Sequence, residues 1–223
     1  MPFYSSPADS EVDASLQNTL NQLVSLATTL PDQIDATRLQ ELNAVAQWIA
    51  DQPADRANLT FICTHNSRRS HMGQVWAQAA AWHFDLTQVH TYSGGTEATA
   101  FNPRAIQALR TLGVGITESA AGQNPTYAVE LQPEQSEFNA FSKKYSHSTN
   151  PQKGFAAVMT CSHADEFCPL VFGADARFSL PYIDPKVSDG TPLESETYKG
   201  RALQIGSEMF YIMAHARKLM DRE

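Results

Sequence analysis

The chain holds three cysteines, Cys63, Cys161 and Cys168, and the surroundings of Cys63 suit a nucleophile beside a bound anion. Cys63 ends a short apolar run, and a polar loop follows it before an amphipathic stretch begins. A loop that opens a helix turns backbone N–H groups inward, and the helix dipole adds partial positive charge. Such a loop binds tetrahedral oxyanions and favours the thiolate form of a cysteine at its base. The sequence therefore predicts a nucleophilic thiolate in an oxyanion-binding loop.

The side chains of this loop can act on the anion, on the sulfur or on the loop itself. Arg69, six residues after Cys63, can close over the anion with two parallel hydrogen bonds. Ser70 can hydrogen-bond the Cys63 sulfur, and Asn66 can brace the loop through its amide. The residues expected to bind the oxyanion are Thr64, His65, Asn66, Ser67, Arg68 and Ser70. The alternative is a buried cysteine at a strand end with a surface arginine nearby.

Cys161 and Cys168 form a second possible centre of thiol chemistry. Cys161 ends an apolar run, and because the carboxyl ends of parallel strands share one sheet edge, we expect it on the same edge as Cys63. If the residues between Cys161 and Cys168 are helical, the thiols start about 10 Å apart, beyond the roughly 7 Å between Cα atoms that a disulfide allows. A Cys161–Cys168 disulfide would then require this segment to unwind. The alternative is that all three thiols are buried and inert.

The elements that must position these residues alternate between strand and helix. Short apolar runs predict strands at 59–63, 89–93 and 155–161, and a weaker strand at 178–183 in which Pro181 suggests a sheet edge. Amphipathic runs predict helices at 70–84, 103–112 and 197–220. This alternation is typical of an α/β fold with a parallel sheet. Asp184 follows the fourth predicted strand, and a carboxylic acid there could protonate a departing oxygen.

Two regions stand outside this alternation. Residues 1–55 hold one arginine, Arg38, against eight acidic residues, and two amphipathic stretches in them predict a helical hairpin. We expect 1–55 to be an acidic helical extension with a structural or dimer-forming role, and 56–223 to be the α/β domain. Residues 119–154 are rich in Ser, Asn, Gln and Pro and predict an insertion with irregular or short β structure. It could be a lid near the site or a disordered excursion.

Charge and hydropathy exclude several classes of protein. The net charge of −8 argues against a general nucleic-acid binder, whose surface should be basic. Residues 56–110 nevertheless hold five arginines against two acidic residues, which favours an anionic ligand there. No apolar run reaches the roughly 18 residues of a membrane-spanning helix, and the first residues lack the pattern of a secretory signal. A cytoplasmic protein is therefore expected, in which three thiols do not predict a disulfide framework.

Four segments resemble the low-molecular-weight tyrosine phosphatase superfamily, and within it most closely the thioredoxin-coupled arsenate reductases. LTFICTHNSRRSHMGQVWA resembles the opening strand, phosphate loop and first helix of that fold, and TYSGGTEATAFNPRAIQAL resembles its second strand and next helix. VMTCSHADEFCPL resembles the redox segment of the reductases, and YIDP the strand end that carries the acid. The resemblance covers about residues 58–118 and 155–220. It implies a four-stranded parallel sheet flanked by helices, preceded here by the N-terminal helical hairpin extension.

The resemblance also implies a reaction, the reduction of arsenate to arsenite through a three-cysteine relay. The Cys63 thiolate would attack arsenic beneath Arg69 while Asp184 protonates the leaving hydroxide. Cys161 would then attack Cys63, releasing arsenite and forming a Cys63–Cys161 disulfide. Cys168 would attack Cys161 and leave a Cys161–Cys168 disulfide for thioredoxin to reduce. The relay implies no metal and no organic cofactor.

Two positions depart from the family pattern. His65 stands where the loop usually has Gly, which matters if this position needs a positive φ. Gln74 stands where many arsenate reductases carry a Glu that helps to hold a potassium ion, so the resemblance does not carry that ion over to this chain.

Two other functions fit the same residues. The first is a phosphatase that acts on phosphotyrosine or a small phosphoester through a cysteinyl-phosphate. A tyrosine-specific site usually has aromatic residues beside the acid, whereas Asp184 is followed by Pro185, Lys186 and Val187. The second is a non-catalytic oxyanion or redox sensor that keeps the loop without turnover.

Overall fold

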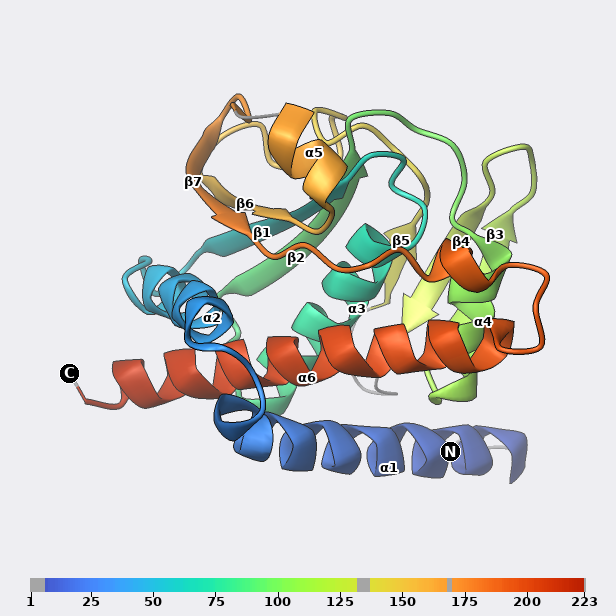
Figure 1. Ribbon diagram of the computed structural model, residues 1–223, viewed down its shortest axis with the longest axis horizontal. Helices are drawn as coiled ribbons and strands as arrows, with labels where there is room; N and C mark the ends of the chain where they lie inside the picture. The colour runs from blue at the N-terminus through green and yellow to red at the C-terminus, as the bar shows by residue number, and fades with distance from the viewer. Residues whose placement is uncertain (1–6, 132–136, 168–169, 223) are drawn as a thin grey trace, which may run out of the picture.

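The computed structural model describes residues 7–131, 137–167 and 170–222. Its helices are α1 (Pro7–Thr29), the 3-10 helix η1 (Leu30–Asp32), α2 (Ala36–Ala50), α3 (Arg69–His83), α4 (Pro103–Thr111), α5 (Ser162–Phe167), the 3-10 helix η2 (Pro185–Ser188) and α6 (Glu194–Met220). Its strands are β1 (Ala57–Cys63), β2 (Val89–Gly95), β3 (Gly115–Ala120), β4 (Thr126–Glu130), β5 (Phe138–Ala140), β6 (Phe155–Met159) and β7 (Ala174–Ser179). Figure 1 shows how these elements are layered.

The central element is a parallel sheet with strand order β2-β1-β6-β7, which confirms the predicted four-stranded parallel sheet. Every residue of β1 and β6 is buried, because helices cover both faces of the sheet (Figure 1). Strands β1 and β6 end side by side, with Ile62 paired with Met159. Cys63 is the next residue of β1 and Cys161 lies two residues beyond β6, so both cysteines lie at the same edge of the sheet.

The edge strand β7 differs in its bounds from the strand predicted at 178–183. It begins earlier and ends before Pro181, whose nitrogen has no hydrogen to donate to the sheet. The chain still follows β6 after β7 ends, since the Leu180 N–H donates to Met159 O (2.9 Å) and the Tyr182 N–H to Thr160 O (3.2 Å). This extended run brings Asp184 to the sheet edge at which β1 and β6 end.

The helices α3 and α6 pack together on one face of the sheet, and α5 covers the other face (Figure 1). Helix α3 approaches β1 closely at Gly73, where a Cβ atom would lie 2.6 Å from Cδ1 of Phe61. Glycine is therefore required for α3 to lie this near the strand whose end carries Cys63. None of the described helices combines the length and apolarity needed to cross a lipid bilayer.

The helices α1 and α2 of the predicted hairpin are both present and both pack on α6. Figure 1 shows an open hairpin, in which α1 lies along α6 while α2 crosses it. The apolar stripe of α1 supplies buried leucines such as Leu20 and Leu23. Leu23 fits against Gly206 of α6, where a Cβ atom would lie 2.8 Å from Leu23 Cδ2. The apolar residues of both helices therefore belong to the main core.

The predicted insertion contains short β structure in its described part. Strands β3, β4 and β5 form a separate antiparallel sheet, with β3 beginning before residue 119. The chain then returns to the edge of the central sheet, where the Gly95 N–H donates to Lys143 O (2.9 Å) and the Tyr145 N–H to Gly95 O (2.9 Å). Residues 141–145 are therefore fixed beside β2 and the loop after β1, rather than forming a disordered excursion.

Candidate active site

The loop between β1 and α3 holds Cys63 at its base. The Cys63 sulfur lies 3.1 Å from Ser70 Oγ, and the Asn66 amide donates to the same Ser70 oxygen at 2.9 Å. All three residues are buried. Asn66 adopts a positive φ of 43°, whereas His65 does not. Asparagine tolerates this left-handed conformation better than most residues. Because the positive φ falls at position 66 and not at 65, the histidine at position 65 carries no backbone strain.

Residues 142 and 143 of the insertion brace this loop from outside. The Lys143 N–H donates to Asn66 Oδ1 at 2.8 Å, and Ser142 Oγ donates to the carbonyl oxygen of His65 at 2.9 Å. Sequence analysis predicted that Asn66 braces the loop but did not identify these partners. The adjacent positive charges of Lys143 and Lys144, in a segment of mostly uncharged polar residues, were the one sequence feature that pointed to this part of the insertion.

A buried positive charge lies behind the loop at Lys143. Its ammonium group lies 4.6 Å from the centre of the Phe141 ring and 3.4 Å from the Phe141 carbonyl oxygen. Burial lowers the pKa of Lys143 to about 8. The neighbouring His71 is stacked on Phe101 with ring centroids 3.9 Å apart. Burial, and then the Lys143 ammonium, hold the pKa of His71 well below its usual value, so His71 is neutral at pH 7.

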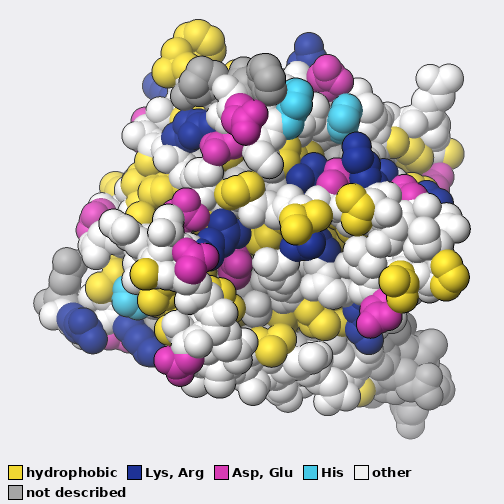
Figure 2. Space-filling model, in the orientation of Figure 1, with side chains coloured by type: hydrophobic (Ala, Val, Ile, Leu, Met, Phe, Trp, Pro, Cys, Tyr) yellow, Lys and Arg dark blue, Asp and Glu magenta, His cyan; other side chains and the backbone are white. Residues whose placement is uncertain are grey.

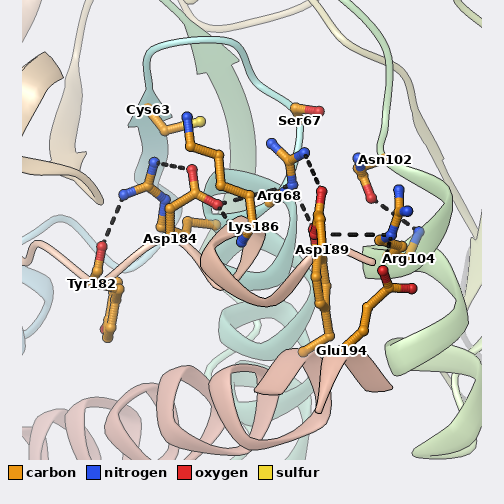
Figure 3. A network of polar contacts seen from close by, with 12 residues as sticks. Cys63, Ser67, Arg68, Asn102, Arg104, Tyr182, Asp184, Lys186, Asp189 and Glu194 are labelled. Atoms are coloured by element: carbon orange, nitrogen blue, oxygen red, sulfur yellow. Dashed lines mark hydrogen bonds and ion pairs between the residues drawn. The ribbon is translucent and has the colours of Figure 1, made fainter. Parts of the chain in front are cut away.

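Arg69 and Asp184 meet at the mouth of the loop. Arg69 donates from Nη2 to Asp184 Oδ2 (2.8 Å) and from Nη1 to the carbonyl oxygen of Tyr182 (2.8 Å), while its Nε is buried without a hydrogen-bond partner. Asp184 also caps η2 by accepting from the Lys186 N–H (3.1 Å). In Figure 3 the Lys186 side chain extends from η2 toward Cys63. The predicted acid and the predicted anion-binding arginine are therefore in direct contact.

Arg68 lies on the other side of this acid and faces α6. Its Nε donates to Tyr198 Oη at 2.9 Å, and the guanidinium lies 3.9 Å from Asp184 and 3.8 Å from Asp189. Tyr198 in turn donates to Asp189 at 2.8 Å. Figure 3 shows this network running from Tyr182 past Asp184 and Arg68 to Asp189. Arg68 and Arg69 thus both approach the Asp184 carboxylate, and Arg68 also approaches that of Asp189.

The remaining oxyanion candidates lie around the loop backbone. The Thr64 carbonyl accepts from the Glu97 N–H (2.8 Å), and Ser67 Oγ donates to the carbonyl oxygen of Ala100 at 2.8 Å. His65 is half-exposed, with Nε2 at 3.7 Å from a carboxylate oxygen of Glu97. The side chains of Ser67 and His65 therefore contact the segment 97–100.

Cys161 reaches the loop through Thr64. The Cys161 sulfur lies 3.5 Å from Thr64 Oγ1 and accepts from the Ala164 N–H of α5 at 3.4 Å. The Thr64 hydroxyl also lies 3.4 Å from Nδ1 of His163. Cys63 and Cys161 are both free thiols and both buried. The segment that follows Cys161 is the helix α5, whereas Cys168 lies outside the described residues, so the pairing of Cys161 with Cys168 stays a prediction.

Gln74 occupies the position at which many arsenate reductases carry a Glu that helps to hold a potassium ion. Its Nε2 donates to the carbonyl oxygen of Thr91 at 3.1 Å, and its Oε1 is buried without a partner. Gln74 thus lacks the negative charge that a Glu would bring to this position. Within the described ranges, no group of three or more His, Cys, Asp or Glu residues could hold a metal.

Comparison with known proteins finds arsenate reductases by sequence and phosphatases by structure. No family model matches the sequence. The chain is 31% identical over 156 residues to arsenate reductase 2 of Staphylococcus epidermidis, covering 66% of this chain and 99% of that protein. It is 36% identical over 139 residues to an arsenate reductase of Bacillus licheniformis, covering 62% and 81%. A solved low-molecular-weight protein tyrosine phosphatase from T. tengcongensis covers 71% of this chain and 98% of its own, with 15% identity and a TM-score of 0.48.

The relatives that the chain covers over most of their length are enzymes, and this chain is an enzyme too. It belongs to the arsenate reductase family.

Proposed function

We propose that this protein reduces arsenate to arsenite with Cys63 as the nucleophile and Cys161 as the second thiol. The observation that carries the proposal is the placement of two buried free thiols at one sheet edge, with Thr64 of the anion loop 3.5 Å from the Cys161 sulfur. A phosphatase needs only the first of these thiols. The relatives named arsenate reductase support the same choice.

The first step forms a bond between sulfur and arsenic. Arsenate binds to the loop N–H groups and to Arg69, and this draws the guanidinium away from Asp184. The Cys63 thiolate attacks arsenic(V), and the departing hydroxide takes a proton from Asp184 and leaves as water. Ser70, 3.1 Å from the Cys63 sulfur, stabilises the thiolate before the attack.

The second step transfers two electrons to arsenic. The Cys161 thiolate attacks the Cys63 sulfur, the sulfur–arsenic bond breaks, and its electron pair stays on arsenic, which leaves as arsenite. A Cys63–Cys161 disulfide remains. Cys168 then attacks Cys161 and frees the Cys63 thiol, and thioredoxin, an external dithiol, reduces the Cys161–Cys168 disulfide. One dithiol is oxidised for each arsenate reduced, so no metal or organic cofactor enters the balance.

The test is a thioredoxin-coupled arsenate assay run beside hydrolysis of p-nitrophenyl phosphate on the same preparation. We expect Cys63→Ser to abolish both activities, because both need the nucleophile. Cys161→Ser and Cys168→Ser should abolish arsenate reduction and spare any phosphatase activity. Repeated turnover of arsenate by the Cys168→Ser protein with thioredoxin alone would contradict the three-thiol relay.

A phosphatase is the second candidate, because Cys63, Arg69 and Asp184 suffice for a cysteinyl-phosphate mechanism. The rim next to the acid carries the exposed aliphatic side chains of Ile183 and Val187 rather than aromatic rings. Figure 2 shows hydrophobic side chains scattered singly among charged ones on this face of the molecule. This rim suits a small phosphoester better than a phosphotyrosine peptide. Phosphate release without arsenate reduction would favour the phosphatase, and arsenate binding with neither activity would favour a sensor.

A further inference from the structure

Arg38 is the one arginine of the first 55 residues, and it is partly buried where α2 meets α6. Its Nη2 lies 2.7 Å from Glu208 Oε2 and its Nε donates to Glu208 Oε1 at 3.3 Å, so the two side chains form a bidentate pair. The Glu208 side chain is 2% exposed. A carboxylate buried this deeply depends on its partner, because an uncompensated buried charge is strongly unfavourable.

The same carboxylate holds Tyr182. The Tyr182 hydroxyl donates to Glu208 Oε2 at 2.6 Å, and the Arg38 guanidinium lies 4.9 Å from the centre of the Tyr182 ring. Tyr182 is buried. Burial, and then the Glu208 carboxylate, raise the pKa of Tyr182 well above its usual value of 10, so the hydroxyl is a permanent donor at neutral pH. Glu208 therefore fixes the hydroxyl of this tyrosine, and Arg38 lies over its ring.

The backbone of Tyr182 belongs to the candidate active site. Its carbonyl oxygen accepts from Arg69 Nη1 at 2.8 Å, and its N–H donates to Thr160 O, next to Cys161, at 3.2 Å. Asp184, two residues further on, accepts from Arg69 Nη2 at 2.8 Å. A shift of Tyr182 would therefore move one of the two groups that orient Arg69 and displace the run that carries the other.

We propose that Arg38 is a positioning residue for the oxyanion site, acting through Glu208 and Tyr182 on Arg69. The proposal rests on the proposed function only in that the oxyanion binds under Arg69. On this proposal, α2 helps to position the oxyanion site and is not a separate extension. Arginine suits the position because its planar fork pairs with both carboxylate oxygens while its face stacks near the ring, which lysine does not reproduce.

An ion pair with a purely structural role would stabilise the fold without changing anion affinity. The chain offers a control variant that weakens the packing of α2 on α6 without touching this ion pair. Tyr211 of α6 donates to Asn43 Oδ1 of α2 at 2.8 Å, so Asn43→Ala breaks a different contact between the same two helices, one in which neither Glu208 nor Tyr182 takes part. Arg38→Met removes the salt-bridge partner of Glu208, although Arg201 still acts on this carboxylate electrostatically. The double variant Arg38→Met/Glu208→Gln removes both charges and keeps an oxygen that can accept from the Tyr182 hydroxyl.

The experiment measures arsenate affinity in a Cys161→Ser/Cys168→Ser background, in which Cys63 is the single remaining thiol. Arsenate protection of Cys63 against iodoacetamide gives the dissociation constant, and urea unfolding of each variant gives its stability. We expect Arg38→Met to weaken arsenate binding about tenfold, which corresponds to the loss of one well-oriented charge-assisted hydrogen bond. Asn43→Ala should leave the affinity unchanged, and the double variant should recover most of it.

The outcomes separate this inference from the proposed function. Equal arsenate affinity in the Arg38→Met protein and in its parent overturns the inference, as does an equal loss of affinity in Asn43→Ala. If arsenate protects Cys63 and Arg38→Met weakens the protection while the three-cysteine protein fails to reduce arsenate, the reductase proposal is wrong and the positioning of Arg69 by Arg38 stands. If arsenate gives no protection in the parent, both are wrong.

Discussion

At the scale of a single residue, Asn66 links the Cys63 loop to the inserted segment that packs against it. Its amide nitrogen donates to Ser70, which lies against the Cys63 sulfur, and its amide oxygen accepts from the Lys143 N–H. Its backbone takes the positive φ on which the turn of the loop depends. Because asparagine combines a donor, an acceptor and tolerance of the left-handed region, one residue fixes the loop on both sides.

Lys143 makes stability depend on pH in a defined window. Burial lowers its pKa from 10.5 to about 8, so between these values the unfolded chain holds a proton that the folded protein has released. The free energy of unfolding should therefore rise with pH from about 8 to about 10.5. Below pH 8 the buried ammonium costs the fold on the order of 3 kcal/mol, since one pKa unit corresponds to about 1.4 kcal/mol.

Lys143→Met should remove this rise, which urea unfolding at pH 7 and pH 10 would measure. Lys144→Met is the matched control, because Lys144 is the exposed neighbour on the same segment. The control should keep the pH dependence of the parent. A rise of equal size in the Lys143→Met protein would show that another group titrates.

At the scale of elements, the periodicity of apolar residues predicted the central α/β pattern correctly. The strands at 59–63 and 155–161 overlap β1 and β6, and the helix at 197–220 overlaps α6, because buried strands and amphipathic helices leave clear sequence patterns. The bounds of β7 were wrong because its residues are only partly buried and follow no clear alternation. Local periodicity also says nothing about where an inserted segment docks, so the bracing of Asn66 by residue 143 was not predictable.

Gly73 sets the distance between α3 and β1, and its replacement tests that contact. In Gly73→Ala the new Cβ atom would lie 2.6 Å from Phe61 Cδ1, so either the Phe61 ring or the helix with the anion loop at its start must shift. We expect a loss of about 1–3 kcal/mol in the free energy of unfolding, typical of overpacking. Urea unfolding would measure it.

Gly200 in α6 provides the control for this substitution. A Cβ atom there would meet nothing within 4 Å, so Gly200→Ala should stabilise the protein by about 0.5–1 kcal/mol through helix propensity alone. If both alanine variants gained stability, Phe61 would have to move aside at little cost, and the close approach of α3 to β1 would not constrain the loop.

At the scale of the whole molecule, the candidate site draws on segments far apart in the chain. The anion loop follows β1, the second thiol follows β6, and the acid follows β7, all at one edge of the sheet. Sequence analysis brought these three together because parallel strands share that edge. The pairing of Arg38 with Glu208 across 170 residues was not predictable, since a lone arginine in an acidic segment resembles a solvated surface charge. The catalytic roles of the site residues stay predictions.

Removing α1 and α2 should destabilise the rest of the molecule, because both helices contribute to its main core. Buried residues such as Leu20, Leu23 and Ile49 come from these helices, and fully burying a side chain of this kind contributes about 1.5–3 kcal/mol. A chain of residues 56–223 would expose their partners on α6 and leave Glu208 without Arg38. We expect its free energy of unfolding to fall by on the order of 5 kcal/mol or more, measured by urea unfolding.

Complementation distinguishes lost packing from a general defect of the shortened chain. A separate peptide of residues 1–55 should bind to the exposed face of α6 and restore both the unfolding midpoint and the arsenate protection of Cys63, because it returns the apolar contacts and the Arg38–Glu208 pair together. The same peptide with Arg38→Met should restore much of the midpoint but less of the protection. A 56–223 chain that unfolds at the midpoint of the full protein and binds arsenate equally well would show that neither the core nor the anion site depends on these helices.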